Sequence, residues 1–353
     1  MSARRRRSSE SGPDLFGEAT ASSPSTFRPR IVAGLDEAGL GPMLGPLTIG
    51  MSAFRVTDAC TDLWVALADA CTNEIGRKGE RLVVADSKVV FTRTDGGAHR
   101  LESTVLAFDA LRNASGLTHV DARSFLEAAA FDRASHQDLA REAWFAALPT
   151  RLARDIDDTE LARRSQNLAG CARVARVELV ALSVGAVPPV ALNAAFARTD
   201  NKSTAHWEVC APYLRDLWTR FASEGVEVVV DRHGGRMRYA TLLRDTFAGA
   251  DVETIGEVPE RSEYLVTSSD GRALRIVFAE KSESFSFAVA LASCAAKYAR
   301  EVCMAGFNAY FGALQQGLMP TAGYVTDARR WLAEAELAIE RSGIARDAIV
   351  RSR

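Results

Sequence analysis

Two adjacent acids that open a glycine-rich turn, within residues 31–47, constrain the fold of this chain more than any other feature. The segment reads IVAGLDEAGLGPMLGPL. Its first apolar run predicts a buried strand that ends at Asp36 and Glu37, and the run after the turn predicts the next strand of a hairpin. Successive strand side chains point to opposite faces, so the two acids cannot both be core residues. Because a buried acid is costly without a cation, the pattern indicates a metal site beside a polymeric or phosphorylated substrate.

Composition limits the classes of protein to which the chain can belong. It has 353 residues, 47% of them hydrophobic and 25% charged, which is enough for one large core or two smaller ones. No apolar run approaches the roughly 20 residues that span a bilayer, so we expect no membrane partner. The six cysteines include no C-x-x-C pair, which favours reduced thiols in a cytoplasmic protein over a disulfide or zinc framework. A net charge of −2 leaves a nucleic-acid partner undecided, because a near-neutral chain can still carry a local basic groove.

The order of patterns along the chain predicts an α/β domain. Residues 1–28, rich in Arg, Ser, Pro and Gly, are expected to form a disordered N-terminal arm. Paired strands followed by strands that alternate with helices predict a mixed sheet. Helical patterns indicate an insertion at about 100–170 and a helical tail from about 305. Further strands are expected at 82–85, 177–184, 226–231, 252–255 and 276–278, and helices at 63–70, 122–130, 137–152, 207–223, 285–305 and 328–349.

A third acid, Asp231, ends the clearest strand after the first, at residues 226–231. Hydrolysis of a phosphodiester by two metal ions needs three or four carboxylates that converge on cations about 3.5–4 Å apart. Taken alone, Asp231 is better explained as a turn or cap residue before His233. Because Asp36 and Glu37 also lie at the end of a strand, Asp231 is a candidate for a third carboxylate of the same metal site.

The segment GLDEAGLGPMLGPL resembles the N-terminal signature of the type 2 and type 3 ribonucleases H, which cut RNA paired to DNA. Three further segments resemble motifs of that family, namely Asp86-Ser87-Lys88, the alanine-rich stretch 279–300, and Gly323 to Thr326. The resemblance implies that residues 29–353 form a ribonuclease H-like catalytic domain, with a mixed sheet flanked by helices, the helical insertion and the C-terminal helical tail. The segment at about 100–170 matches nothing in the family pattern.

The resemblance also implies a set of metal ligands. Asp36, Glu37 and Asp231 correspond to family acids that hold Mg²⁺ or Mn²⁺. The fourth acid is either Glu280 or Glu283, and counting back without gaps from the alanine-rich helix favours Glu283. Oxygen ligands from a few acids suit Mg²⁺, which keeps several of its waters.

Five residues are implied on the substrate side. Gly39 and Gly41 offer their backbone to a 2′-hydroxyl, Lys88 reaches a phosphate, and Tyr324 stacks at the ribose beside the scissile bond. Leu40 departs from the pattern, because the family has Arg or Lys between these two glycines. Loss of that cation puts cleavage at single embedded ribonucleotides in doubt more than cleavage of long hybrids.

The expected function is therefore metal-dependent hydrolysis of the RNA strand of RNA–DNA hybrids, giving 5′-phosphate and 3′-hydroxyl ends, by a monomer in the cytoplasm. The alternative is a catalytically weak or inactive nucleic-acid-binding protein of the same fold, which Leu40 and the near-neutral charge motivate. Four acids facing phosphates argue against that alternative, since a binder gains nothing from them. A nucleotide-binding switch is excluded because the chain has no G-x-x-x-x-G-K-[ST] segment.

Overall fold

A mixed sheet of seven strands in the order β5-β2-β1-β6-β9-β8-β7 forms the centre of the protein. The computed structural model describes residues 27–57, 62–76, 79–92, 96–113 and 121–352. Two short strands, β3 (Cys71–Thr72) and β4 (Leu82–Val83), pair in parallel outside the main sheet. The strands of the main sheet are β1 (Ile31–Ala38), β2 (Leu47–Arg55), β5 (Glu178–Val187), β6 (Val226–Asp231), β7 (Asp251–Val258), β8 (Arg261–Thr267) and β9 (Ala273–Ala279).

Strand β1 joins the antiparallel and parallel parts of this sheet. It pairs antiparallel with β2 on one side and parallel with β6 on the other, and β6 in turn pairs parallel with β9. The register of β1 and β6 sets Leu35 opposite Val230. Because parallel strands end at the same edge of a sheet, the next residues of both strands, Asp36 and Asp231, emerge side by side.

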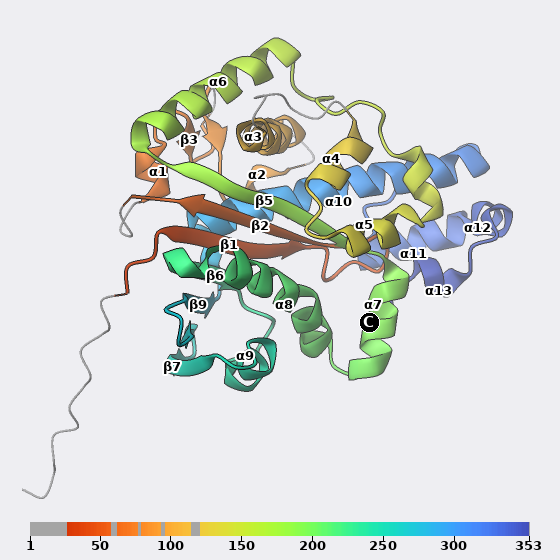
Figure 1. The fold of residues 1–353 in the computed structure, drawn as a ribbon. Helices are drawn as coiled ribbons and strands as arrows, with labels where there is room; N and C mark the ends of the chain where they lie inside the picture. Colours follow the sequence, from red (N-terminus) through yellow and green to blue (C-terminus); the bar gives the residue numbers. More distant parts are fainter. Residues whose placement is uncertain (1–26, 58–61, 77–78, 93–95, 114–120, 353) are drawn as a thin grey trace, which may run out of the picture.

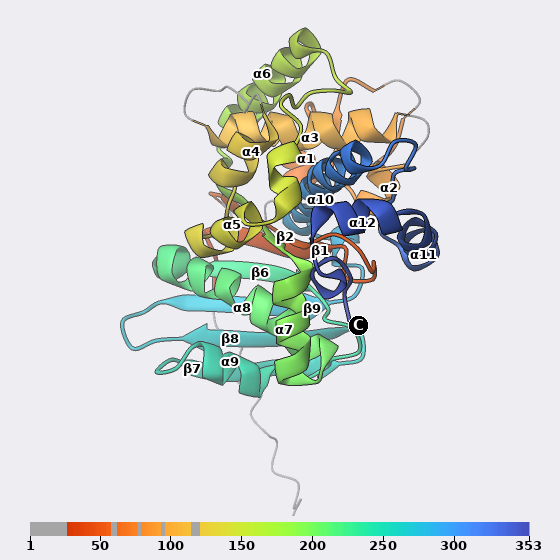
Figure 2. The same ribbon diagram turned by 90° about the vertical axis from the view of Figure 1, so that its right-hand side faces the viewer.

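Helices cover both faces of the sheet (Figures 1 and 2). Side chains along β1 point alternately to the two faces of the sheet, and a separate hydrophobic core lies on each face. Ile31, Ala33 and Leu35 pack toward one face with α7 (Pro189–Thr199), α8 (Lys202–Phe221) and α9 (Ala240–Thr246), whereas Phe54 of β2 packs toward the other. The second face carries α3 (Gly97–Arg112), α6 (Asp158–Ala175) and the long α10 (Phe287–Leu314). The remaining helices are α1 (Leu63–Ala66), α2 (Ser87–Val90), α4 (Ala122–Ala128), α5 (Arg133–Ala140), η1 (Ala143–Ala147), η2 (Ala222–Glu224), η3 (Ser282–Ser284), α11 (Val325–Glu334), α12 (Glu336–Ser342) and α13 (Arg346–Ile349).

Helix α10 lies directly on the backbone of β1 and β2. A Cβ added at Gly34 would come within 2.2 Å of the Val289 backbone nitrogen, and one at Gly50 within 2.1 Å of the Ala292 carbonyl oxygen. The Ser52 hydroxyl donates a hydrogen bond of 2.8 Å to the Ala288 carbonyl oxygen. Glycines on the strands and alanines on the helix thus let the backbone of α10 approach the backbone of the sheet with few side chains between them.

The structure confirms the predicted α/β class with a mixed sheet flanked by helices. Two helix predictions were wrong. The segment 137–152 contains the end of α5 and the short η1, with a turn between them, and η1 ends at Ala147 because Pro149 disfavours a helical conformation at Leu148. The segment 328–349 is three helices, and Gly343 ends the second of them in a left-handed conformation with φ of 66°. Strand β8 and helix α7 were not predicted, and the expected boundary at about 305 falls inside α10.

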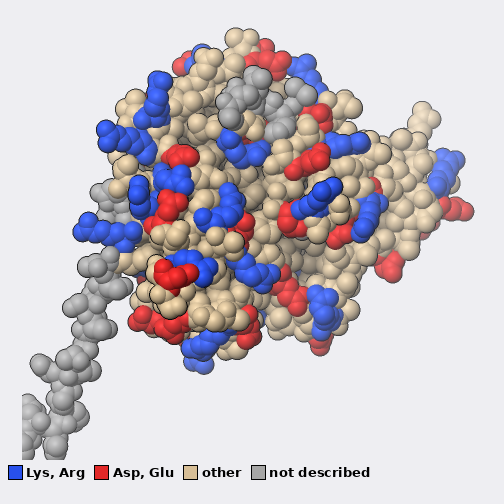
Figure 3. Space-filling model, viewed as in Figure 1, with Lys and Arg blue, Asp and Glu red and all other residues tan. Residues whose placement is uncertain are grey.

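The predicted N-terminal arm lies outside the described residues except at its last two positions. Figure 3 shows basic and acidic side chains interspersed over one face of the molecule, in keeping with the net charge of −2. No helix in the described part of the chain has both the length and the apolar character needed to cross a membrane.

Candidate active site

Three carboxylates meet at the edge of the sheet where β1 and β6 end. Oxygen atoms of Asp36, Glu37 and Asp231 all lie within 4.8 Å of one another. They line a pocket of about 230 Å³ together with Glu283 and Lys88. The structure therefore brings the four acids expected from the sequence into one pocket, although almost two hundred residues separate the second from the third.

Neighbouring polar groups orient these acids. The Glu37 backbone N–H donates a hydrogen bond of 2.7 Å to Asp36 Oδ1, and the Ser282 hydroxyl donates one of 3.2 Å to Asp231 Oδ1. Asp36 lies on the α10 side, and Ser293 of α10 lines the same pocket. Glu37 reaches the opposite side, and its Oε2 atom is 3.5 Å from Nε2 of His206 on α8.

The environment of these carboxyl groups disfavours their charged forms. Burial, followed by the charge of Asp231, raises the pKa of Asp36 to about 8. Burial and the charge of Asp36 raise the pKa of Glu37 well above its usual range, and burial also raises the pKa of Asp231 and of Glu283. Burial lowers the pKa of Lys88, but the charges of Asp86, Asp36, Glu283 and Asp231 outweigh it and hold this pKa above its ordinary value. Oxygen donors crowded in this way fit a divalent cation such as Mg²⁺ or Mn²⁺, whose charge would remove the repulsion.

Glu280 and Glu283 both line this pocket but differ in their partners. Glu280 Oε1 accepts a hydrogen bond of 3.2 Å from Arg232 Nη1, and the Glu280 side chain is 62% exposed. Glu283 lies in η3, where its carboxylate interacts with the charges of Asp231 and Lys88. Glu280 thus has a cation of its own, whereas Glu283 faces the acid cluster.

The substrate-side residues line a second pocket of about 450 Å³ that adjoins the first, with Glu37 and Lys88 among the residues common to both. Gly41 is exposed and a Cβ there would meet nothing within 4 Å, while Tyr324 is 52% exposed at the start of α11. Leu40 is half-buried and packs against the core on the α8 side. The residues expected on the substrate side, all of which line this pocket, are Gly39, Leu40, Gly41, Lys88 and Tyr324.

Two buried arginines, neither of them predicted as a site residue, hold the glycine-rich turn in place. Arg300 of α10 donates to the carbonyl oxygens of Pro46, Leu44 (3.1 Å) and Ala322 (3.2 Å). Arg351 donates to the Gly39 carbonyl oxygen and, at 2.6 Å and 3.0 Å, to that of Gly45. The role of Arg300 could have been predicted from its position inside the apolar pattern of α10, because a buried guanidinium needs several hydrogen-bond acceptors.

The turn is also tied to the loop before Tyr324. The Met43 and Leu44 backbone N–H groups donate hydrogen bonds of 2.8 Å and 3.2 Å to the Gly323 carbonyl oxygen. Gly39 has a φ of 89°, a conformation that a side chain would strain. The turn and the tyrosine are therefore one unit beside the acids.

No protein-family model and no curated protein matches the sequence of this chain. Three solved structures are similar to it in fold. A chain in the PCNA:RNase HII complex from Archaeoglobus fulgidus shares 17% identity over 92% of this chain and 94% of that chain, with a TM-score of 0.42. Ribonuclease H2 from Pyrococcus horikoshii OT3 shares 17% identity over 90% and 92%, with a TM-score of 0.41. A mutant of Bst-RNase HIII shares 14% identity over 93% and 72%, with a TM-score of 0.37.

These structures are type 2 and type 3 ribonucleases H, the family that the sequence motifs resemble. At such identities and TM-scores the similarity says nothing about the activity of this chain. We infer that activity from its own side chains.

Proposed function

We propose that this chain is a metal-dependent endonuclease that hydrolyses the RNA strand of RNA–DNA hybrids and leaves 5′-phosphate and 3′-hydroxyl ends. The observation that carries the proposal is the meeting of Asp36, Glu37 and Asp231 at the joined ends of β1 and β6, beside the pocket lined by the glycine turn and Tyr324. Acids that crowd together without a matching set of basic side chains suit cations and a phosphate better than they suit an apolar ligand.

Each part of the site has a role in this proposal. Asp36, Glu37, Asp231 and Glu283 would hold Mg²⁺ or Mn²⁺, which when bound activates a water and stabilises the leaving oxygen. Lys88 lines both pockets and is placed to neutralise a phosphate that bridges them. The exposed ring of Tyr324 offers a surface for the ribose next to the backbone of the turn, where the 2′-hydroxyl that distinguishes RNA from DNA would lie.

We further propose that the protein acts as a monomer in the cytoplasm. The proposed ligands and substrate contacts all come from one chain. The cysteines for which the structure gives a state, Cys71, Cys171, Cys210, Cys294 and Cys303, are free thiols, as in a reducing compartment.

The test is cleavage of end-labelled substrates by the purified protein with Mg²⁺, with Mn²⁺ and with a chelator. We expect cuts in the RNA strand of a hybrid, none in DNA or RNA duplexes of the same sequence, and none with chelator. Tight binding of the hybrid without any cut would favour the alternative of an inactive binding protein, which Leu40 motivates. Cleavage of the DNA duplex at a rate equal to that of the hybrid would refute the proposed substrate.

Leu40→Arg should change the choice between substrates. If the missing cation normally contacts the ribose-bearing junction, its return adds one charge-assisted hydrogen bond of about 1.5 kcal/mol, or about tenfold in rate. We expect kcat/KM for a duplex with one embedded ribonucleotide to rise by about that factor relative to a long hybrid. Leu40→Met, which keeps the half-buried packing, is the control. An unchanged ratio in the arginine variant would show that the backbone of the turn alone recognises the junction.

Glu283→Gln and Glu280→Gln should differ sharply in their effect. Loss of a metal ligand should lower kcat by at least about 100-fold, a change of about 2.7 kcal/mol in the barrier. Glu280 is mostly exposed and pairs with Arg232, so its neutral variant should lose less than about threefold. The two variants are matched in chemistry and lie three residues apart. A larger loss in the Glu280 variant would reverse the assignment of the fourth ligand.

A further inference from the structure

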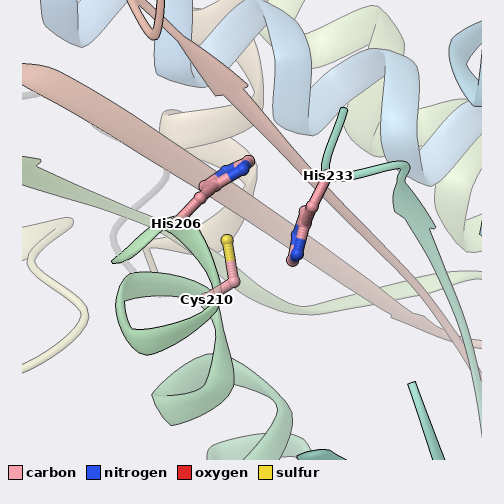
Figure 4. Close-up of side chains that lie close together, drawn as sticks. All are labelled: His206, Cys210 and His233. Carbon is pink, nitrogen blue, oxygen red and sulfur yellow. The ribbon is translucent and has the colours of Figure 1, made fainter. Parts of the chain in front are cut away.

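A second group of metal-ligating side chains lies behind β1, on the opposite side from α10. His206 and Cys210 are one turn apart on α8, and His233 follows the end of β6. One ligand atom from each of the three lies within 4.8 Å of the others. Figure 4 shows the imidazole rings and the thiol pointing toward one another from these two elements. Their exposed fractions are 1% for His206, 3% for Cys210 and 1% for His233.

Both histidines are buried without hydrogen-bond partners. Among the described residues, neither ring nitrogen of His206 or of His233 makes a hydrogen bond. A buried polar group left in this state usually costs about 1–3 kcal/mol, and native proteins rarely retain one without a reason. A neutral imidazole has one nitrogen with a free lone pair. One such nitrogen from each ring, beside the Cys210 thiol, points to a metal ion that accepts these lone pairs.

The His233 side chain is surrounded mainly by other rings. The His233 ring has the aromatic rings of Trp207, Tyr239 and Phe278 around it, with ring centroids 5.8–6.0 Å away. The His206 ring lies closer still, with its centroid 4.1 Å from that of His233. An imidazole binds a metal ion in its neutral form.

We propose that His206, Cys210 and His233 bind one Zn²⁺ ion, with Oε2 of Glu37 as the fourth ligand. The other oxygen of this carboxylate remains for the cation that the acid cluster would hold. Nitrogen and thiolate donors in a buried set of four are the usual environment of structural zinc. Zinc bonds of about 2.0–2.3 Å in a tetrahedron set neighbouring ligand atoms about 3.3–3.7 Å apart. Glu37 Oε2 lies 3.5 Å from His206 Nε2, within that range, and one ligand atom each of His206, Cys210 and His233 lies within 4.8 Å of the others.

Charge balance supports this set of ligands. A Cys210 thiolate and the Glu37 carboxylate would together neutralise the two positive charges of zinc, and the thiol proton would leave to solvent on binding. The ion would fasten α8 to the end of β6, immediately behind the strand that carries Asp36. This inference does not depend on the proposed nuclease activity.

The test is the metal content of the untagged, full-length protein, measured by inductively coupled plasma mass spectrometry after exhaustive dialysis. We expect about one zinc per chain. After removal of zinc with a chelator, added Co²⁺ should give the near-ultraviolet charge-transfer band of a thiolate–cobalt bond and the visible bands of a tetrahedral site. Less than one zinc per ten chains together with no thiolate–cobalt band would overturn the proposal, whatever the variants do.

Three variants locate the ion. Cys210→Ser should weaken zinc binding by more than about 100-fold and abolish the cobalt band. Cys294→Ser is the matched control, because Cys294 is also a buried free thiol but lies on α10. Asp36→Asn should keep its zinc, which separates this ion from any bound at the acid cluster. Zinc that persists in the Cys210 variant and disappears in the Asp36 variant would contradict the assignment.

Discussion

Asp36→Asn should lower kcat for cleavage of an RNA–DNA hybrid by at least about 10³-fold, because the loss of several kcal/mol of metal-dependent stabilisation is felt directly in the barrier. The amide keeps the shape of the side chain and its hydrogen bond with the Glu37 backbone N–H. Binding of the hybrid should stay the same or become tighter, since one negative charge facing the phosphates is gone. Single-turnover cleavage and fluorescence anisotropy on the same labelled hybrid measure the two effects separately.

Glu227→Gln is the control for this variant. Glu227 also lies on β6, but it pairs with Arg275 at 3.0 Å, away from the acid pocket. Its neutral variant should keep nearly full activity. Turnover by purified Asp36→Asn at the wild-type rate would remove Asp36 from the proposed set of ligands and with it the metal site.

Gly34→Ala should destabilise the fold by at least about 3 kcal/mol, the upper end of what overpacking usually costs. The new methyl group would lie 2.2 Å from the Val289 backbone nitrogen, and a helix backbone cannot rotate away as a side chain can. Helix α10 would have to move off the sheet as a unit. The midpoint of urea denaturation, followed by circular dichroism, measures the loss.

Gly170→Ala is the matched control. Gly170 lies inside α6 and a Cβ there meets nothing within 4 Å, so this change should stabilise the protein by about 0.5–1 kcal/mol. Gly50→Ala should behave like Gly34→Ala, because its Cβ would meet the Ala292 carbonyl oxygen. Equal denaturation midpoints for Gly34→Ala and the wild type would mean that α10 lies farther from the backbone of β1 than in this structure.

Much of the fold could be predicted because its signals are local. The apolar runs before Asp36 and Asp231 are buried strands, and their ends are read directly from the sequence. Strand β8 was not predicted because its first residues, Arg261 to Glu263, are polar and its apolar and polar residues do not alternate regularly. The single helix predicted at 137–152 is instead interrupted after Ala140, and its second part ends before Pro149, which disfavours a helical conformation at Leu148.

The candidate site was predicted less completely. The acids stand in motifs, whereas Arg300 and Arg351 act through backbone carbonyls that carry no sequence signal. The buried group behind β1 was missed for a related reason. A spacing of four between His206 and Cys210 on one helix is common, and His233 joins them only because α8 packs on the face of the sheet beside β6.

The hydrogen bonds of the glycine-rich turn have a consequence for how the protein is made. Gly45 accepts from Arg351 across 306 positions of the sequence, and Pro46 accepts from Arg300 across 254. During synthesis, strands β1 and β2 leave the ribosome long before either arginine exists. Contacts between such distant parts of a chain form slowly. The turn should therefore be among the last parts of the molecule to order, so that a nascent chain carries Asp36 and Glu37 well before it has a surface that can bind a nucleic acid.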